Sequence, residues 1–351
     1  MIAGVKKNFA IIFRMEKGLV KPVSQRDIAR EAGLCIATVS RVLTGKADRL
    51  GGVTPETCRK VREAAARLGY RLNVAGRMLR LGKSNAVGLL FSAESALYME
   101  LLGHLQRELF RRGFVAIAGL WHNNDDVGQT ISAVAAHGVD GLIVCHDPEP
   151  VRRLAGDIPA VHFITGDAAS DRVTIGAMDA TLLRHLAECG HKRIVLFGPY
   201  AKDDAPTAAV AEEFGLSLSF VPCCAGRCTD SMRALLIGAL DRFGSPGRMA
   251  GPTALLCATD DYAAMAIAAL MRRGFRVPED VSVGSAESLA FGADFVPSIT
   301  GTVIDLPLLA RTLVETLFRR MENPTAPPVS IEMPLAVSQR ESVAKVEGLK
   351  G

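Results

Sequence analysis

Residues 23–43, VSQRDIAREAGLCIATVSRVL, decide how the N-terminal part of this chain folds. Ser24 followed by Asp27 three residues later is the pattern of a capping box, which opens a first helix. Gly33 is placed to end that helix, and a second helix is predicted to begin near Cys35. The apolar spacing predicts that the inner face of the second helix is formed by Val39, Val42 and Leu43. Two short helices joined by a tight turn are one way to carry a helix into a DNA groove.

The outer face of the second helix has the composition that a DNA groove requires. Arg41 can make a bidentate contact to guanine, while Ile36 and Ala37 can touch a thymine methyl group. The hydroxyl groups of Thr38 and Ser40 can bind phosphate. A small helical hairpin with an apolar seam also occurs in proteins that do not bind DNA, so these residues alone leave both interpretations open.

A third helix is marked at both of its ends. Thr54 is a favourable N-cap, Pro55 suits the first helical position, and Gly69 follows the last turn. Its inner face is predicted to carry Val61, Ala65 and Leu68. The helix would complete a three-helix unit over residues 21–72. The segment that follows, YRLNVAGRMLRLGKS at 70–84, has four basic residues and is too short and too charged for a core helix.

Charge is distributed unevenly along the 351 residues, of which 49% are hydrophobic and 22% charged. The formal net charge is +4, but residues 21–83 hold 14 Lys and Arg against 5 Asp and Glu. Residues 1–20 add +3, which leaves −8 for the remainder. A basic N-terminal unit on an acidic body suits a protein that binds the phosphates of nucleic acid through one part only.

From residue 85 onward, short apolar runs alternate with amphipathic helical patterns. Strands are predicted at 87–91, 115–119, 141–145, 160–163, 194–197, 218–221, 254–258 and 281–283, and a long helix at 306–321. Apolar strands separated by helices favour parallel sheets covered on both faces, and the length allows two such subdomains. Ligands of such sheets bind at the carboxyl ends of the strands, so we expect a binding cleft between the subdomains.

The residue types that catalysis or metal binding would need are not arranged for either. The eight cysteines are scattered, which favours free thiols in a reducing cytoplasm. The cluster of Cys223, Cys224 and Cys228 lacks a paired C-x-x-C or a nearby His. His191 follows a helix-ending glycine and is expected to be structural. The sequence has no G-x-x-x-x-G-K-[ST], G-x-S-x-G or H-E-x-x-H motif. We therefore expect no enzyme, no catalytic residue, no metal and no cofactor.

Several motifs occur in one order and at nearly the spacing of a known family. DIAREAG, TVSRVL, TPET, REAA, RLGYRLN and GRMLRLGKSNAVGLL resemble the DNA-binding head and hinge of the LacI/GalR transcriptional regulators. GVDGLIV at 138–144, ECGHKRIVLFGP at 188–199, TDDYAAMA at 259–266 and RRGFRVPEDVSV at 272–283 resemble the family's core. The resemblance covers nearly the whole chain from about Pro22. It implies an all-α helix-turn-helix head followed by an α/β periplasmic-binding-protein-like core of two doubly wound subdomains.

The resemblance also implies a domain plan. Residues 1–20 would be an N-terminal extension, with Met15 as a possible true start, because the family's head begins close to the chain terminus. The head would cover 21–72, the hinge helix 73–84, the effector-binding and dimerisation core 85–345, and a tail 346–351. No apolar run is long enough to cross a membrane. The expected protein is a cytoplasmic repressor.

The partners that the resemblance implies are a palindromic DNA operator, a second copy of the chain and a small-molecule effector related to sugars. In the head, Ser24 joins the outer-face residues as an expected DNA contact. In the hinge, Arg77 and Arg80 would neutralise phosphates, and Leu79 would enter a base step and kink the duplex. Eight residues around Gly76 are too few for a stable helix in water, so the hinge would fold when it binds DNA.

The sequence departs from the family at several positions. Cys35 stands where Ser is usual, which loses a cap worth about 1 kcal/mol, and RLGG at 49–52 looks inserted. The segment DDAPTAAVAEEFG at 203–215 lacks the Arg-x-x-Gly signature that holds a polar effector. Thr259 replaces a frequent Asn, and Glu287 is the nearest acid in the altered segment SVGSAES. The effector pocket is therefore expected to be rebuilt.

Candidate effector contacts are aromatic rings, which stack on sugar faces, and polar groups, which bind hydroxyls. We select Tyr98, Trp121, Asp147, Thr259 and Glu287. Tyr98 and Trp121 have an alternative interpretation as core residues, and Asp147 as a turn residue before Pro148. A solute-binding protein acting as a sugar sensor or carrier would share the core, but it would need an export signal and would have no basic head.

Overall fold

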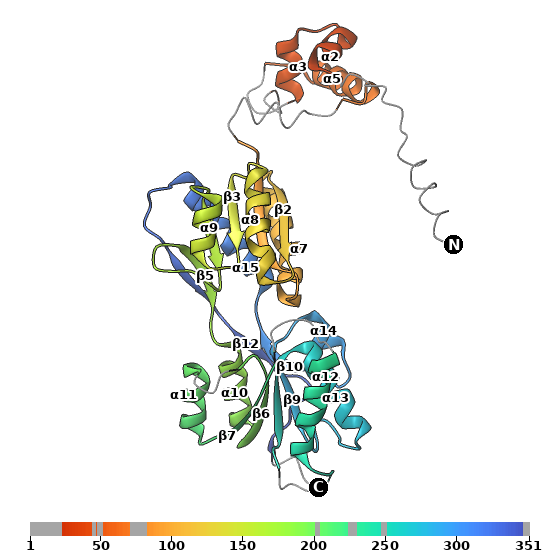
Figure 1. The fold of residues 1–351 in the computed structure, drawn as a ribbon. Helices are drawn as coiled ribbons and strands as arrows, with labels where there is room; N and C mark the ends of the chain where they lie inside the picture. Colours follow the sequence, from red (N-terminus) through yellow and green to blue (C-terminus); the bar gives the residue numbers. More distant parts are fainter. Residues whose placement is uncertain are drawn as a thin grey trace, which may run out of the picture. The chain divides into compact units, whose positions relative to one another are not determined.

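The computed structural model describes residues 23–43, 47, 52–70, 83–200, 204–223, 230–246 and 251–346. The chain forms two compact units, Met1–Gly82 and Lys83–Gly351, which are coloured along the sequence in Figure 1. The sequence-based expectations for the extension, for the hinge at 73–84, and for Cys224 and Cys228 lie outside the described residues, apart from Lys83 and Ser84.

The first unit contains the three predicted helices, α2 (Gln25–Ala32), α3 (Ile36–Leu43) and α5 (Pro55–Arg67). At the start of α2, the backbone N–H of Ser24 donates to Asp27 Oδ2 at 2.9 Å, and Gly33 has a left-handed φ of 64° at its end. At the start of α5, the backbone N–H of Thr57 donates to Thr54 Oγ1 at 3.3 Å. The helices enclose a small apolar core that includes Ile28, Val39, Val42, Val61 and Ala64.

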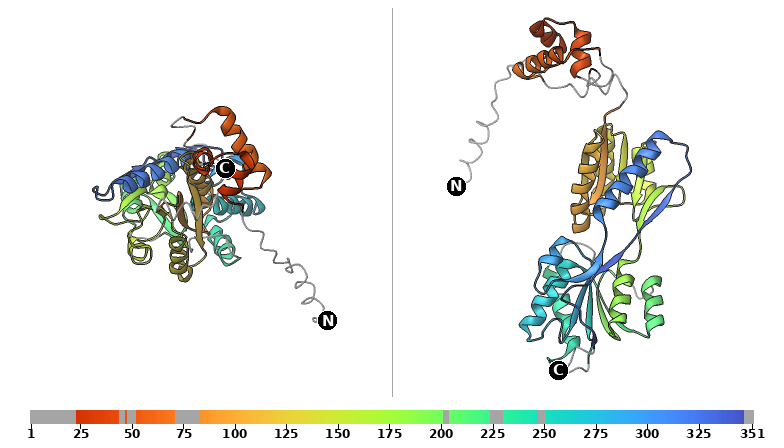
Figure 2. Two further views of the ribbon diagram at one scale, coloured as in Figure 1. Left: turned by 90° about the horizontal axis from the view of Figure 1, so that it is seen from above. Right: turned by 180° about the vertical axis from the view of Figure 1, so that it is seen from behind.

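The second unit contains two sheets, each with six strands in the described chain (Figure 1). The first sheet has the order β11-β5-β4-β3-β1-β2, and its strands are parallel. Its strands are β1 (Ala86–Ser92), β2 (Val115–Trp121), β3 (Gly141–Val144), β4 (Ala160–Phe163), β5 (Asp171–Ile175) and β11 (Ser330–Met333). Helices α7 (Ala96–Arg111) and α15 (Leu306–Glu322) lie side by side on one face (Figure 2). On the other face are η1 (Asn124–Asp126), α8 (Val127–Ala136) and α9 (Pro148–Ala155).

The second sheet has the order β12-β10-β9-β8-β6-β7 and is parallel except for β12. Its strands are β6 (Arg193–Gly198), β7 (Ser217–Pro222), β8 (Ala254–Thr259), β9 (Ser282–Glu287), β10 (Thr300–Val303) and β12 (Ala336–Ser338). One face is covered by α12 (Asp230–Ala239), η2 (Leu240–Phe243) and α13 (Asp260–Arg272), and the other by α10 (Met178–Glu188) and α11 (Ala205–Phe214). The short α14 (Ala290–Asp294) follows β9.

The chain passes between the two subdomains at short segments, which Figure 2 shows from behind. It leaves the first sheet after β5, returns to it between β10 and α15, and leaves it again between β11 and β12. The carboxyl ends of the parallel strands of both sheets therefore face the region between the subdomains.

All eight predicted strands and the long helix are present. The structure adds β5, β10, β11 and β12, which have three to five residues each. Their sequences lack the apolar run on which the prediction relied: β11 is largely exposed, and β5 begins with the buried Asp171, which is paired with Arg319 and Arg320. His191 is buried and structural, as expected: its ring nitrogens bond Thr253 Oγ1 at 2.9 Å and the carbonyl of Ala344 at 3.1 Å.

Candidate functional sites

The outer face of α3 is available for recognition. Val39 and Val42 point into the core of the head, whereas Ile36, which is 45% exposed, Ala37 and Arg41 lie on the solvent side. This is the division into inner and outer faces that the apolar spacing predicts. The face combines a guanidinium group with small apolar side chains, which is the chemistry of direct base readout in the major groove.

The polar residues of this face already make local contacts. Ser24 donates from Oγ to Asp27 Oδ2 at 2.6 Å, so its side chain is part of the capping box. The sulfur of Cys35 lies 3.1 Å from Thr38 Oγ1, at the position where a helix cap is expected. The hydroxyl and then the backbone N–H of Thr38 lower the pKa of the Cys35 thiol. Cys35 therefore replaces part of the cap that we expected to be lost.

Arg41 has Gly52 as a close neighbour. Gly52 is the last residue of the RLGG segment and has a φ of 78°, and a Cβ built there would lie 3.2 Å from Arg41 Nη2. A larger residue at this position would strain the backbone and require a small shift of the flexible guanidinium group. Sequence reasoning identified the arginine but not this neighbour.

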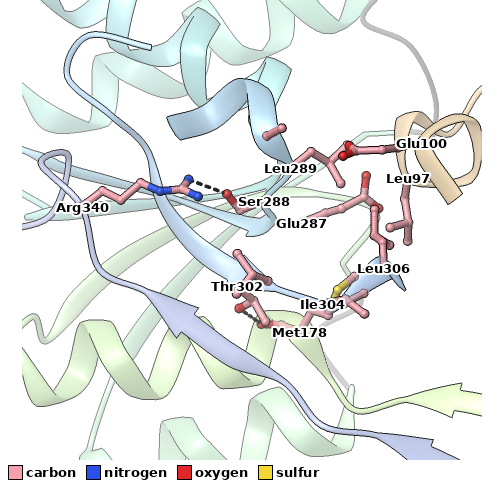
Figure 3. Close-up of a pocket in the computed structure, with 12 residues that line it drawn as sticks. Leu97, Glu100, Met178, Glu287, Ser288, Leu289, Thr302, Ile304, Leu306 and Arg340 are labelled. Carbon is pink, nitrogen blue, oxygen red and sulfur yellow. Dashed lines mark hydrogen bonds between the residues drawn. The ribbon is translucent and has the colours of Figure 1, made fainter. Parts of the chain in front are cut away.

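A large cavity lies between the two subdomains. Its volume is about 1230 Å³, and it is lined by residues at the carboxyl ends of β1, β6, β8 and β9 and by residues of the β5–α10 crossing. Of the predicted effector contacts, Tyr98, Thr259 and Glu287 line this cavity. A smaller adjacent pocket of about 170 Å³ shares Glu100, Met178, Glu287 and Leu289 with it (Figure 3).

Trp121 and Asp147 do not line either cavity, which corrects their expected position. Trp121 ends β2 with its side chain directed into the core, where it is 5% exposed and packs edge-on against His146 at 5.7 Å between ring centroids. Asp147 is exposed and precedes Pro148 at the start of α9. The alternative interpretation of Trp121 as a core residue describes its position. Asp147 was alternatively interpreted as a turn residue before Pro148, and the structure places it at the N-cap of α9 instead.

Tyr98 lies in the first turn of α7, where Ser95 is the N-cap. Its ring packs against Phe91 and Phe163, with centroids 5.4 and 6.1 Å away, and its hydroxyl accepts a hydrogen bond from Cys145 Sγ at 2.7 Å. Burial, followed by the neighbouring Cys145, raises the pKa of Tyr98. Its hydroxyl therefore stays protonated and retains a proton to donate to a ligand.

Glu287 is the last residue of β9 and faces the first turn of α7 across the cleft. Burial raises the pKa of Glu287 from 4.5 to about 7, the charges of Asp261 and Asp260 act in the same direction, and a hydrogen bond from the backbone of Leu97 opposes them. In Figure 3 the carboxyl groups of Glu287 and Glu100 lie on the Leu97 side of the small pocket, while Arg340 reaches Ser288 from the opposite side.

The structure adds cavity residues that sequence reasoning missed. Tyr200 follows β6, and Asp179 and Asp261 lie in the first turns of α10 and α13. No motif marks these residues, and the signal that could have found them is their position just after a predicted strand or at a helix start. In the described chain no group of His, Cys, Asp or Glu side chains is arranged to hold a metal ion. The helices searched in that part of the chain are all too short or too polar to cross a bilayer.

Two family models match the chain. Residues 25–73 match the bacterial regulatory proteins of the lacI family, and residues 183–343 match the periplasmic binding protein-like domain. Relatives from Escherichia coli and Shigella boydii serotype 18, each described as HTH-type transcriptional repressor PurR, are 28% identical over 345 residues, covering 91% of this chain and 96% of theirs.

Solved structures show the same fold. The Lac repressor dimer bound to operator and the anti-inducer ONPF has a TM-score of 0.76 at 21% identity and covers 92% of this chain and 100% of its own. The complex of the transcriptional regulator CelR with cellobiose has a TM-score of 0.62 at 22% identity, covering 91% and 99%. An Enterococcus faecium LacI family regulator with bound ribose has a TM-score of 0.62 at 17% identity, covering 74% and 99%.

A helix-turn-helix head joined to a core with two parallel α/β sheets defines a DNA-binding transcriptional regulator rather than an enzyme. The chain is similar to the LacI family of bacterial regulatory proteins in its head, and to the periplasmic binding protein-like domain in its core.

Proposed function

We propose that the protein is a cytoplasmic repressor that binds a palindromic operator as a homodimer and releases or retains it in response to a small polar molecule. The effector is related to sugars and binds in the cavity between the subdomains, where Tyr98, Thr259 and Glu287 contact it. Trp121 and Asp147 are left out of this proposal because they do not line the cavity.

The observation that carries the proposal is the 1230 Å³ cavity at the carboxyl ends of strands from both sheets. A ligand there touches both subdomains at once, so its binding free energy depends on how they are oriented. A ligand can shift an equilibrium only through such differential contacts, and couplings of this kind are worth about 1–3 kcal/mol.

Similar proteins support the repressor, the dimer and the sugar-like effector of this proposal. PurR is named a repressor, the Lac repressor is described as a dimer on its operator, and cellobiose and ribose are bound by two others. Exposed apolar residues of the first subdomain also support a dimer. Phe110 at the end of α7 is 79% exposed, and Val115 and Leu120 are exposed on β2, which is an edge strand.

For the coupling to DNA we propose the hinge, on the resemblance alone, because Arg77, Leu79 and Arg80 lie outside the described residues. Two hinge segments of a dimer would fold together in the minor groove, with the arginines on phosphates and the leucines in base steps. The effector would act by changing the separation of the two hinges, which prevents or permits this folding.

Selection of binding sites from random duplex DNA tests the function directly. The expected product is a palindrome bound by a dimer, because one recognition helix reads only a few base pairs and two half-sites multiply specificity. Analytical ultracentrifugation gives the stoichiometry. A monomer that binds a single half-site as tightly as the full palindrome would refute the dimer, and recovery of no preferred sequence would favour the carrier alternative.

A further inference from the structure

The effector cavity is strongly acidic, which bears on what it binds if the proposed function is correct. Its lining includes Glu94, Glu100, Asp179, Asp204, Asp261 and Glu287. Among the described residues that line it there is no Lys or Arg. Six carboxyl groups around one cavity create a field that attracts cations and repels sugar acids and sugar phosphates.

Four of these carboxyl groups have local hydrogen-bond partners, and one of the four is Glu287, which accepts from the backbone of Leu97. Glu94 Oε1 lies 3.0 Å from Nδ1 of the exposed His122, Asp179 accepts from Thr207 Oγ1 at 2.8 Å, and Asp204 accepts from the backbone of Thr207. For Glu100, Asp261 and Glu287, the described part of the chain supplies no ion pair. These three come from α7, α13 and β9, so they surround the cavity from both subdomains.

The arginine that lines the small pocket together with Glu287 already has partners. Arg340 lines the small pocket, and its Nη1 donates to Ser288 Oγ at 2.9 Å and to the carbonyl of Ile299 at 2.6 Å. Figure 3 shows this guanidinium group on the side of the pocket away from the carboxyl groups of Glu100 and Glu287. The arginine therefore holds the backbone after β9 and leaves these acids for a ligand.

A separate observation also indicates a polar ligand. The buried oxygens Tyr200 Oη and Thr259 Oγ1 have no hydrogen-bond partner in the described chain, although both residues line the cavity. A buried polar group left without a partner is costly, so native proteins rarely keep one without a reason. Burial and then the charge of Asp179 raise the pKa of Tyr200, so its hydroxyl stays protonated.

Aromatic rings are also among the groups that line the cavity. Tyr98 and Tyr200 line the cavity, and Phe291, which is 54% exposed, lies at α14. Carboxylates combined with aromatic faces are the groups by which proteins recognise ammonium ions, whereas hydroxyl donors and acceptors recognise polyols. The cavity offers both kinds of group in one space.

We propose that the effector carries a positive charge on a polyhydroxylated frame, as an amino sugar does. Its ammonium group lies among Glu287, Asp261 and Glu100, and its hydroxyl groups bond Tyr200 Oη and Thr259 Oγ1. This narrows the sugar-like effector of the proposed function to its cationic members and excludes the anionic ones.

Ligands that share one sugar frame and carry an ammonium group, only hydroxyl groups, or a carboxylate group test this. Isothermal titration at pH 7 would compare the amino, neutral and acid forms of the gluco, galacto and manno sugars, with thermal shift as a second readout. At least one amino form should bind roughly tenfold or more tightly than its neutral counterpart, and the acid forms should not bind. A neutral form that binds equally well, an acid form that binds better, or no amino form that binds below about 10 mM overturns the proposal.

Two variants locate the charge. Glu287→Gln and Asp261→Asn keep the size of the side chain, and each should weaken the amino form by roughly tenfold while changing a neutral form by less than roughly twofold. Glu322→Gln, at the exposed end of α15, is the matched control and should change neither. Equal loss for both forms would overturn the ammonium site. Operator release by a neutral sugar alone would uphold the proposed function and refute this inference, whereas absence of any selected operator would refute the proposed function itself.

Discussion

The head and the large cavity of the core carry opposite charges. Residues 21–83 hold 14 basic against 5 acidic residues, and the outer face of α3 carries Arg41. The cavity is lined by six carboxyl groups. One chain can therefore bind a polyanion through one unit while its other binding site repels polyanions. The comparison implies that each site can be damaged without damaging the other.

Val61→Asp should have the largest effect, because it should abolish DNA binding by the head without affecting ligand binding by the core. Val61 is completely buried in the head, and an unpaired buried charge costs several kcal/mol, which should unfold this small core. Operator binding should disappear, while the core keeps its melting transition and its ligand shift in calorimetry. Lys60→Asp places the same residue type at the neighbouring exposed position and should leave the head folded. Operator binding by the Val61 variant would show that the head is not the DNA-binding unit.

Leu79→Ala tests the link between the two units. If the leucine enters a base step, the variant should lose roughly a hundredfold in operator affinity, about 3 kcal/mol, together with the DNA bend. The dimer and effector binding should remain. Gel mobility of circularly permuted operator fragments measures the bend. A variant that binds and bends like the parent would make the hinge a plain tether.

The pH dependence of stability tests the acidic cavity without a ligand. Because folding raises the pKa of Glu287 from 4.5 to about 7, the folded state holds a proton that the unfolded state has lost between these values. Stability should therefore fall as pH rises from about 4.5 to 7, by up to roughly 3 kcal/mol. Glu287→Gln should remove this fall, making the variant more stable than the parent at pH 8 and equal to it at pH 4. Parallel curves for the two proteins would contradict the shift.

Arg41→Ala tests whether the outer face of α3 reads the base sequence of the operator. Loss of a bidentate base contact should cost about 1–3 kcal/mol and relax the preference at one base pair of each half-site. Lys60→Ala, away from the outer face of α3, is the control. Equal weakening on all sequences, with a smaller salt dependence, would instead identify Arg41 as a phosphate contact.

Cys35→Ser should have the smallest effect. Serine is a stronger N-cap than cysteine, so melting of the head should rise, by at most about 1 kcal/mol, because the sulfur already contacts Thr38. Cys58→Ser, in the buried core of the same head, is the contrasting variant and should destabilise it. A loss of stability in the Cys35 variant would show that the thiol supplies something beyond a cap.

The parts of the fold that follow local rules were predictable. Thr54, Pro55 and Gly69 delimit α5 by capping chemistry alone, and apolar runs such as 254–258 mark strands buried on both faces. The strand β5 was not predictable because its first residue, Asp171, is an acid whose burial depends on Arg319 and Arg320 about 150 residues later.

The residues that line the cavity were only partly predictable, because their positions also depend on contacts between parts of the chain that are distant in sequence. Glu287 ends β9 and Tyr98 lies in the helix that follows β1, so their position beside the cavity could be inferred from the fold. Trp121 also ends a strand, but strand residues alternate between faces, and its register directs it into the core instead. The unsatisfied hydroxyl of Tyr200 is a property of the assembled cavity, and no spacing in the sequence encodes it.

The crossings between the subdomains affect how the protein is made. The first sheet begins with β1 at Ala86 but is completed by β11, which ends at Met333, and α15 covers one of its faces. During synthesis this sheet must therefore wait for nearly the entire chain before its edge strand and its covering helix exist. The second sheet also needs β12, which follows β11. A single cut in the chain cannot separate either subdomain whole. We therefore expect the two subdomains of the core to complete their folding together, after most of the chain has left the ribosome.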